Sequence, residues 1–324
     1  MSLTYNSKKA SEIHPYLRGI TFTECSSENS DKLDISLHDT DKIWLTKWFP
    51  KKGDKLGLNI YLKDQWQDKK KKIKIPCGKF TLDDFTIQYG SCDLSALSQP
   101  ASESFNVTER TKTWKNVTIK GVAQEFGNKY KLKVVYEAIS IQIKEIEQNG
   151  KTDSAFLTEL CKEYGLAYKI YSNQIVIRDF EDYEKKKAVM TIKEKDVSSD
   201  WTFNDTLYGI YTGAKISYTN ASTKTDVTVM VGSAKRLLNV TQKADDERDA
   251  KLKANAKVAE SNRKATTMTL TIMANSKIYA GCNVNLSGFA KKIDGKYSVS
   301  KVVHSIDASA VYTMKLDLYR IVKK

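Results

Sequence analysis

Apolar residues alternate with polar ones over many short segments of this chain. The clearest case spans residues 56–62, where Leu56, Leu58, Ile60 and Leu62 are separated by Gly, Asn and Tyr. A repeat of two residues is that of a β-strand with one buried face. Segments with the same repeat lie at residues 33–37, 85–89, 117–119, 214–219, 227–231, 267–272 and 312–318. Many short strands separated by turn residues predict small antiparallel barrels or sandwiches.

The middle of the chain has the repeat of a helix. The apolar residues of 152–164 fall on one helical face, Asp153 is the expected N-cap, and Gly165 is the expected end of the helix, with positive φ. Strand-like residues 131–136 precede this helix, and short strands around 167–171 and 174–178 follow it, joined by a turn at 172–173. The face of the predicted helix consists of Phe156, Leu157, Leu160, Cys161 and Tyr164.

A second helix is predicted at residues 241–264, with acidic residues near its start and Arg263 and Lys264 at its end. Its apolar stripe is thin, which favours a position on the surface. The Ser-rich residues 90–109 are expected to form a loop. The predicted fold is therefore mainly β with an α+β insert: a first β-barrel at 1–121, an α+β domain at 122–195, and a second β-barrel at 196–324 that carries the helix.

The net charge of +14 comes almost entirely from lysine. Only seven of the 53 basic residues are Arg, the side chain best suited to bidentate contacts with phosphates and bases. The densest run, Lys69 to Lys72 followed by Lys74, fits a solvated hairpin tip better than a nucleic-acid contact. Nucleic acid is therefore not predicted as a specific ligand.

The remaining composition narrows the class of protein. No apolar run approaches the length of a membrane-spanning helix, and the first residues are polar rather than those of a secretory signal. The five cysteines are widely spaced, which favours reduced thiols and synthesis in a bacterial cytoplasm over a disulfide framework.

Motifs for catalysis and metal binding are sparse. The sequence lacks HExxH, GxSxG, Walker and GxGxxG patterns, so no catalytic, cofactor-binding or metal-binding residue and no small-molecule substrate are predicted. His38 with Asp39 and Asp41 fits a solvated turn better than a metal site. His304, in an apolar strand, fits a hydrogen-bonded structural imidazole better than a general base.

Two adjacent pairs of acidic residues invite comparison with a glycosidase. Asp83 and Asp84 point to opposite faces if their segment is a strand, so they would not act together. Glu181 and Asp182 precede a run of lysines and fit a charged surface loop. Catalysis is not expected, although distant carboxylates can converge in any fold.

The closing part of the chain has the residues of a small barrel. Gly281 and Gly288 bracket a short predicted strand and permit tight turns at its ends. Asp294 and Gly295 form a hairpin signal, and Tyr297 begins the next strand, which continues to His304.

Three segments in this order resemble the phage late control D family, the central baseplate hubs of contractile phage tails and phage-tail-like bacteriocins, which are related to the hub part of type VI secretion spike proteins. The segments are the helix from Asp153 to Gly165, the Ala-rich helix at 241–264, and the closing stretch at 280–316. The resemblance covers about 122 to the end, and it covers the first barrel only by strand pattern. Only a short segment follows His304, so spike and wall-degrading domains are expected on other chains.

The resemblance implies a structural function. Two similar barrels per chain in a homotrimer would form a pseudo-sixfold ring that joins the tail tube protein to the central spike protein, with the insert facing other baseplate proteins. Two alternatives stay open from the residues themselves. One is a tail-associated cell-wall hydrolase, and the other is a basic nucleic-acid-binding protein.

Overall fold

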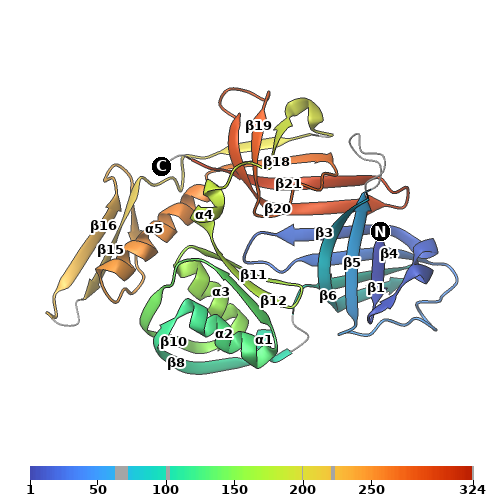
Figure 1. Ribbon diagram of the computed structural model, residues 1–324, viewed down its shortest axis with the longest axis horizontal. Coiled ribbons are helices and arrows are strands. Elements are labelled where there is room, and N and C mark those ends of the chain that lie inside the picture. Colours follow the sequence, from blue (N-terminus) through green and yellow to red (C-terminus); the bar gives the residue numbers. More distant parts are fainter. Residues whose placement is uncertain (63–71, 100–102, 199, 220–222, 323–324) are drawn as a thin grey trace.

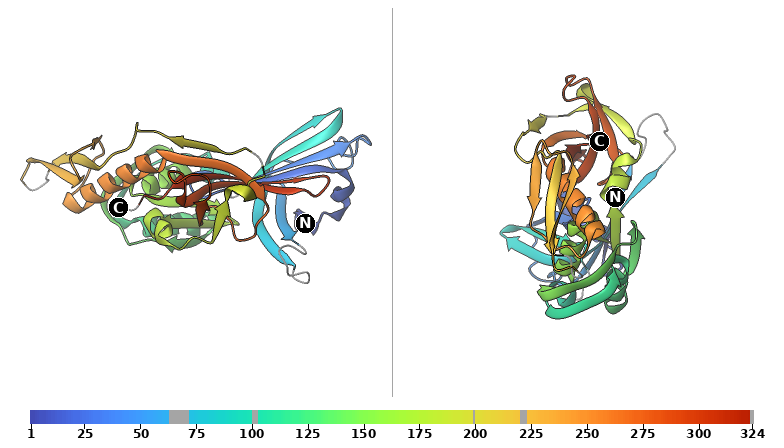
Figure 2. Two further views of the ribbon diagram at one scale, coloured as in Figure 1. Left: turned by 90° about the horizontal axis from the view of Figure 1, so that it is seen from above. Right: turned by 90° about the vertical axis from the view of Figure 1, so that its left-hand side faces the viewer.

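The computed structural model describes residues 1–62, 72–99, 103–198, 200–219 and 223–322. The molecule is elongated, with an N-terminal β region at one end and a small sheet covered by α5 at the other (Figure 1). A C-terminal β region and an α+β insert lie between these ends. Figure 2 shows that the strands of the N-terminal region splay apart at its outer end.

In the N-terminal β region, the two-residue repeats at 33–37, 56–62 and 85–88 lie in strands, as predicted. Its core positions alternate along each strand, as Leu33, Ile35 and Leu37 do on β4. The predicted loop at 90–109 is wrong in its first half, because residues 90–97 form a strand between β4 and β6. The buried side of this strand consists of Cys92, Leu94 and Ala96, and the small side chains of Cys92 and Ala96 among polar residues give a weak apolar pattern. The elements are β1 (Ser2–Tyr5), β2 (Lys8–Lys9), the 3-10 helix η1 (Ser11–Tyr16), β3 (Leu17–Cys25), β4 (Lys32–Asp39), β5 (Lys55–Leu62), β6 (Ile73–Gln88) and β7 (Gly90–Leu97).

The C-terminal β region continues the same sheet. Strand β20 pairs antiparallel with β3, with Ile306 opposite Ile20, so the two β regions share one sheet and one hydrophobic core. The mainly β fold is thus confirmed, and its two β regions are fused along this strand pair. The elements are β13 (Met190–Lys193), the 3-10 helix η2 (Glu194–Asp196), β14 (Thr202–Asp205), β18 (Thr266–Met273), β19 (Asn283–Ser287), β20 (Gly295–Asp307) and β21 (Tyr312–Arg320).

The α+β insert begins earlier in the chain than the predicted boundary at residue 122. Trp114 on β8 is buried in the insert's own core, and β8 pairs with β10. The predicted strand at 117–119 ends at Thr118, whose side chain accepts a hydrogen bond from Gly121 N and starts a helix at Ile119. The elements are α1 (Glu103–Asn106), β8 (Glu109–Thr118), α2 (Ile119–Tyr130), β9 (Lys133–Glu137), β10 (Gln142–Thr152), α3 (Asp153–Glu163), β11 (Leu166–Tyr171), β12 (Gln174–Asp179) and α4 (Phe180–Lys185).

The insertion in the C-terminal region is also larger than predicted. It starts at Gly213 rather than at residue 241, because three strands form a separate sheet on which the helix packs. The helix is less exposed than its thin stripe predicts, since Ala250 and Ala254 are fully buried against this sheet. Small residues allow this close packing but give a weak apolar signal. The elements are β15 (Gly213–Thr219), β16 (Asp226–Gly232), β17 (Leu237–Val240) and α5 (Glu247–Arg263).

Candidate functional site

Asp153 lies at the centre of a polar cluster inside the insert. Only 1% of this residue is exposed, yet its carboxylate accepts hydrogen bonds from Tyr130 Oη at 2.5 Å, Gln148 Nε2 at 2.7 Å and Lys129 Nζ at 2.9 Å. The predicted N-cap is wrong by one residue, because the side chain of Thr152 accepts the capping bond from the helix. The carboxylate instead joins α3 to α2 and β10.

The other residues of this motif form the core of the insert. Phe156 stacks on Trp114 with ring centroids 5.9 Å apart, and Leu157 is fully buried. The motif is therefore the packing face of α3, as its helical repeat predicts.

Tyr164 and Gly165 lie in the contact between the insert and α5. Tyr164 Oη donates to Asp249 Oδ1 at 2.7 Å. Burial of the hydroxyl is the main cause that raises the pKa of Tyr164, and the hydrogen bond to the Asp249 carboxylate raises it further. Gly165 has φ +70°, and a Cβ there would lie 3.1 Å from Ala256 Cβ. Glycine is therefore required twice, for its backbone conformation and for the close approach of α5.

The closing motif builds the turn between β19 and β20. The carboxylate of Asp294 accepts hydrogen bonds from Gly288 N and Phe289 N, each at 3.0 Å. Gly281 and Gly288, which are predicted to permit tight turns, have φ of +94° and +84°, and Gly295 has φ +151°. These residues fix the hairpin that the Asp-Gly pair predicts, with Leu286 opposite Gly295.

Tyr297 and His304 anchor β20 in the core. Tyr297 is fully buried and donates to the carbonyl of Ile293 at 2.7 Å. His304 is 2% exposed; its Nδ1 lies 2.6 Å from Tyr312 Oη, and its ring stacks on Phe22 with centroids 5.1 Å apart. His304 thus has the predicted hydrogen-bonded place in the core.

A cleft of about 360 Å³ opens beside His304, where the two β regions meet the insert. We call it the junction cleft. Glu24 is the only Asp or Glu among the described residues that line it, and Lys74, Lys169 and Arg178 also line it. Burial would raise the pKa of Glu24, but His304 and Lys169 outweigh burial and lower it. A glycosidase needs two carboxylates across the bond it cleaves, and the lining of this cleft offers one.

A buried ion pair joins the insert to the N-terminal β region next to the junction cleft. Lys169 Nζ lies 3.0 Å from Asp31 Oδ2 and donates to the carbonyl of Cys25 at 2.8 Å. Burial outweighs the attraction of Lys169 and raises the pKa of Asp31 to about 6. Nearby, Ser98 Oγ donates to the carbonyl of Ile170 at 2.9 Å. Sequence reasoning missed this pair, because nothing in the sequence links two residues so far apart.

The acidic candidates for catalysis or metal binding lie on different elements: at the end of β4 and in the turn after it, on β6, and on α4. Asp39 is buried and accepts a hydrogen bond from Trp44 N at 3.0 Å, while His38 and Asp41 are exposed. Asp83 and Asp84 are both exposed on β6. Within the described ranges, no group of three His, Cys, Asp or Glu is placed to hold a metal ion. The loop predicted at Glu181 and Asp182 is wrong, because both residues lie in the first turn of α4, and the side chain of Asp179 caps that helix.

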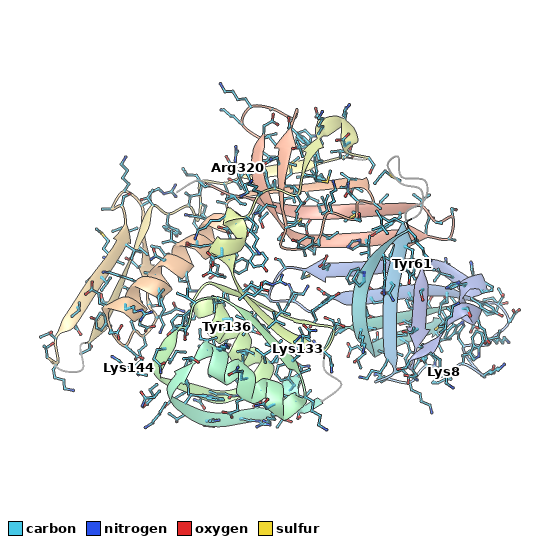
Figure 3. The ribbon with its side chains drawn as sticks, in the orientation of Figure 1. Lys8, Tyr61, Lys133, Tyr136, Lys144 and Arg320 are labelled. Carbon is cyan, nitrogen blue, oxygen red and sulfur yellow. The ribbon has the colours of Figure 1, made fainter. Side chains whose placement is uncertain are left out.

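The lysine run lies mostly outside the described residues. Lys69, Lys70 and Lys71 belong to that part, whereas Lys72 Nζ lies 4.1 Å from the centre of the Tyr61 ring. Tyr61 is labelled in Figure 3, on β5 of the N-terminal region. The five cysteines are buried and free, as reduced thiols would be.

The sequence of residues 106–319 matches the model of the YQBQ-like family, which is about two thirds of the chain. The chain belongs to the YQBQ-like family. No curated protein sequence matches the chain. No helix of the described residues is long and apolar enough to cross a membrane.

Several solved structures have the same fold over nearly the whole chain. The 43 kDa tail protein of prophage MuSo2 from Shewanella oneidensis aligns with a TM-score of 0.73 and 14% identity, covering 98% of this chain and 97% of that one. A tail protein from Neisseria meningitidis aligns with a TM-score of 0.72 and 11% identity, covering 98% and 96%. A type VI secretion system component from E. coli aligns with a TM-score of 0.60 and 9% identity, covering 95% and 74%. This YQBQ-like chain therefore has the fold of phage tail proteins.

Proposed function

We propose that this chain is the structural baseplate hub of a contractile phage tail or a phage-tail-like particle. In this proposal three copies form a pseudo-sixfold ring that joins the tail tube to the central spike. The observation that carries the proposal is the shared fold with two proteins described as tail proteins, because it extends over nearly the full length of each. A structural protein acts through its overall shape, so similarity over the whole fold bears on its function more than a shared set of a few site residues would.

The arrangement of the two β regions supports the ring. They are fused through β3 and β20 into one sheet with one core, so each copy supplies two β regions in a rigid unit. Three such copies supply six β regions, and heterologous contacts between copies close into a ring under threefold symmetry. We propose that residues 1–99 and the C-terminal region without residues 213–263 correspond to the two hub barrels.

The proposed partners follow from this place in the particle. They are two further copies of the chain, the tail tube protein, the central spike protein and other baseplate proteins, which contact the insert. The chain is made in the bacterial cytoplasm and then enters the assembled baseplate. We propose no catalytic activity, cofactor or small-molecule substrate.

The oligomeric state in the presence of the spike partner tests this function. Purified chain, alone and with its spike partner, is analysed by sedimentation velocity, and we expect a trimer in at least one of the two samples. A monomer in both samples would contradict the ring. A zymogram on cell walls and an electrophoretic shift with DNA test the two alternatives: clearing of the wall or a strong DNA shift would favour one of them over the hub.

A further inference from the structure

A groove of about 570 Å³ lies at the outer end of the N-terminal β region, away from the insert and α5. We call it the N-terminal groove. It is lined by β1, β2, η1 and the segment of residues 44–54. Lys8, one of its lining residues, is labelled in Figure 3 at the opposite end of the molecule from Lys144. None of the residues that line the N-terminal groove belongs to the motifs at 153–165 and 281–304 or to the junction cleft.

Aromatic side chains form one part of the lining. Trp48 packs edge-on against Trp44 and Tyr16, with centroids 5.5 and 5.8 Å away. Phe49 is 52% exposed although it packs against Phe85 on its inner side. A half-exposed phenyl ring beside a hollow offers apolar surface that a partner's side chain can cover.

Lysines form another part of the lining. Lys8, Lys9, Lys47 and Lys51 are exposed, and no described carboxylate lies within ion-pair distance of their ammonium groups. Two carboxylates, those of Glu12 and Asp54, also line the groove, against four lysines. The carboxylate of Asp54 already accepts hydrogen bonds from Tyr5 Oη, Asn6 Nδ2 and Lys51 N. The groove therefore carries excess positive charge.

A buried donor without a partner adds a second observation. Trp44 is 2% exposed and lines the groove, and its indole Nε1 has no acceptor among the described residues. Buried polar groups are normally hydrogen-bonded, so the unpaired indole N–H of this lining residue calls for an acceptor. A segment with carboxylate and carbonyl oxygens supplies acceptors of this kind.

We propose that the N-terminal groove binds an acidic segment of a partner protein, with an apolar side chain of that segment packed on Phe49. The lysines attract the carboxylates, and the aromatic lining accepts the apolar side chain. Nucleic acid fits less well, because Trp48 already packs against two other rings and Phe49 alone offers a half-exposed ring for base stacking. The proposal does not depend on the trimer or on the hub function.

Peptide binding to the full chain, followed by fluorescence anisotropy, tests the proposal. The probes are labelled peptides of glutamate and leucine, of glutamate and serine, and of lysine and leucine, and a thymidine oligonucleotide of equal length. We expect binding of the glutamate–leucine peptide, about tenfold weaker binding of the glutamate–serine peptide, and none of the lysine–leucine peptide. Failure of the glutamate–leucine peptide to bind, or tighter binding of the oligonucleotide, would overturn the proposal.

Matched variants locate the binding in the groove. Lys8→Gln with Lys47→Gln should weaken binding about fivefold, whereas Lys291→Gln with Lys292→Gln, equal in charge and exposed on a distant turn, should leave it unchanged. Phe49→Ser should weaken binding about tenfold, and Tyr208→Ser, at a residue 89% exposed, should not. Equal losses from the groove variants and their controls would place the binding elsewhere and contradict the proposal. Thermal melts of each variant identify any that fail to fold.

Discussion

The insert is attached at two junctions that use buried charge in opposite ways. At the first, β11 meets the N-terminal region, and the carboxylate of Asp31 has one cation, Lys169, as its partner. At the second, α3 meets α5, and the ammonium of Lys253 lies 2.8 Å from Glu163 and 3.0 Å from Asp249. At the first junction a single cation does not offset the cost of burying the charged carboxylate of Asp31. At the second, two carboxylates do offset the cost of burying the charged ammonium of Lys253.

The difference sets the pH at which each junction responds. The pKa of Asp31 is raised to about 6, so this carboxyl binds its proton more tightly in the folded state. Its contribution to stability is full below its ordinary pKa near 4 and is lost as pH rises to about 6. Burial would lower the pKa of Lys253, but Glu163 and Asp249 raise it. The ammonium of Lys253 therefore keeps its charge, and its contribution to stability, until strongly alkaline conditions.

Removing one partner of the first ion pair should have the largest effect. Lys169→Met leaves Asp31 buried without its cation, and we expect the free energy of unfolding to fall by about 4 kcal/mol at neutral pH. Adding Asp31→Asn should recover part of this loss. Urea unfolding measures both. Lys32→Met, which breaks an exposed pair with Asp34, is the control and should cost less than about 1 kcal/mol.

The pH dependence of stability is the next largest effect. A carboxyl pKa raised from 3.8 to about 6 corresponds to about 3 kcal/mol, lost as pH increases across that interval. Urea unfolding of the wild type and of Asp31→Asn at a series of pH values gives this contribution by difference. Identical pH profiles for the two proteins would show that Asp31 does not set the response of the first junction.

Gly165→Ala probes the second junction and should cost about 2 kcal/mol. The substitution adds backbone strain at φ +70° and presses a methyl group against Ala256. Gly150→Ala is the matched control, because Gly150 has φ +56° and nothing within 4 Å of an added Cβ. The difference between the two variants in urea unfolding measures the close approach of α5 alone, and equal costs would mean that this approach is not tight.

Tyr164→Phe should have the smallest effect, about 1.5 kcal/mol, because it removes one hydrogen bond to a carboxylate that keeps other partners. A double-mutant cycle with Asp249→Asn measures the coupling of the two side chains. Tyr136→Phe, which loses an exposed bond to the carbonyl of Ile139, is the control. Zero coupling would mean that Tyr164 holds α5 only by packing.

At both junctions the sequence predicts the local elements, but it does not predict the contacts between them. The repeat of Phe156, Leu157 and Leu160 identifies α3, and Gly165 is found from the helix end alone. Its close approach to Ala256 depends on a residue far along the chain, so only the fold reveals it. The same holds for Asp31 and Lys169, because nothing in the sequence distinguishes them from other charged residues and only the packing of β11 on the N-terminal region pairs them.

Two elements were missed for local reasons. β7 carries its apolar side on Cys92, Leu94 and Ala96, among serines that are typical of loops. The start of α2 has the alternation of a strand at Val117 and Ile119, and the capping bond of Thr118 decides for a helix. β7 forms because its backbone pairs with β4 and β6, whereas α2 begins because of the local capping bond at Thr118.

The position of this chain in native particles tests the central claim most directly. Electron microscopy of particles that carry a label on this chain should show the label on the particle axis, at the tip of the tail tube next to the spike. A label along the tail, at the periphery of the baseplate, or absent from the particle would contradict the hub.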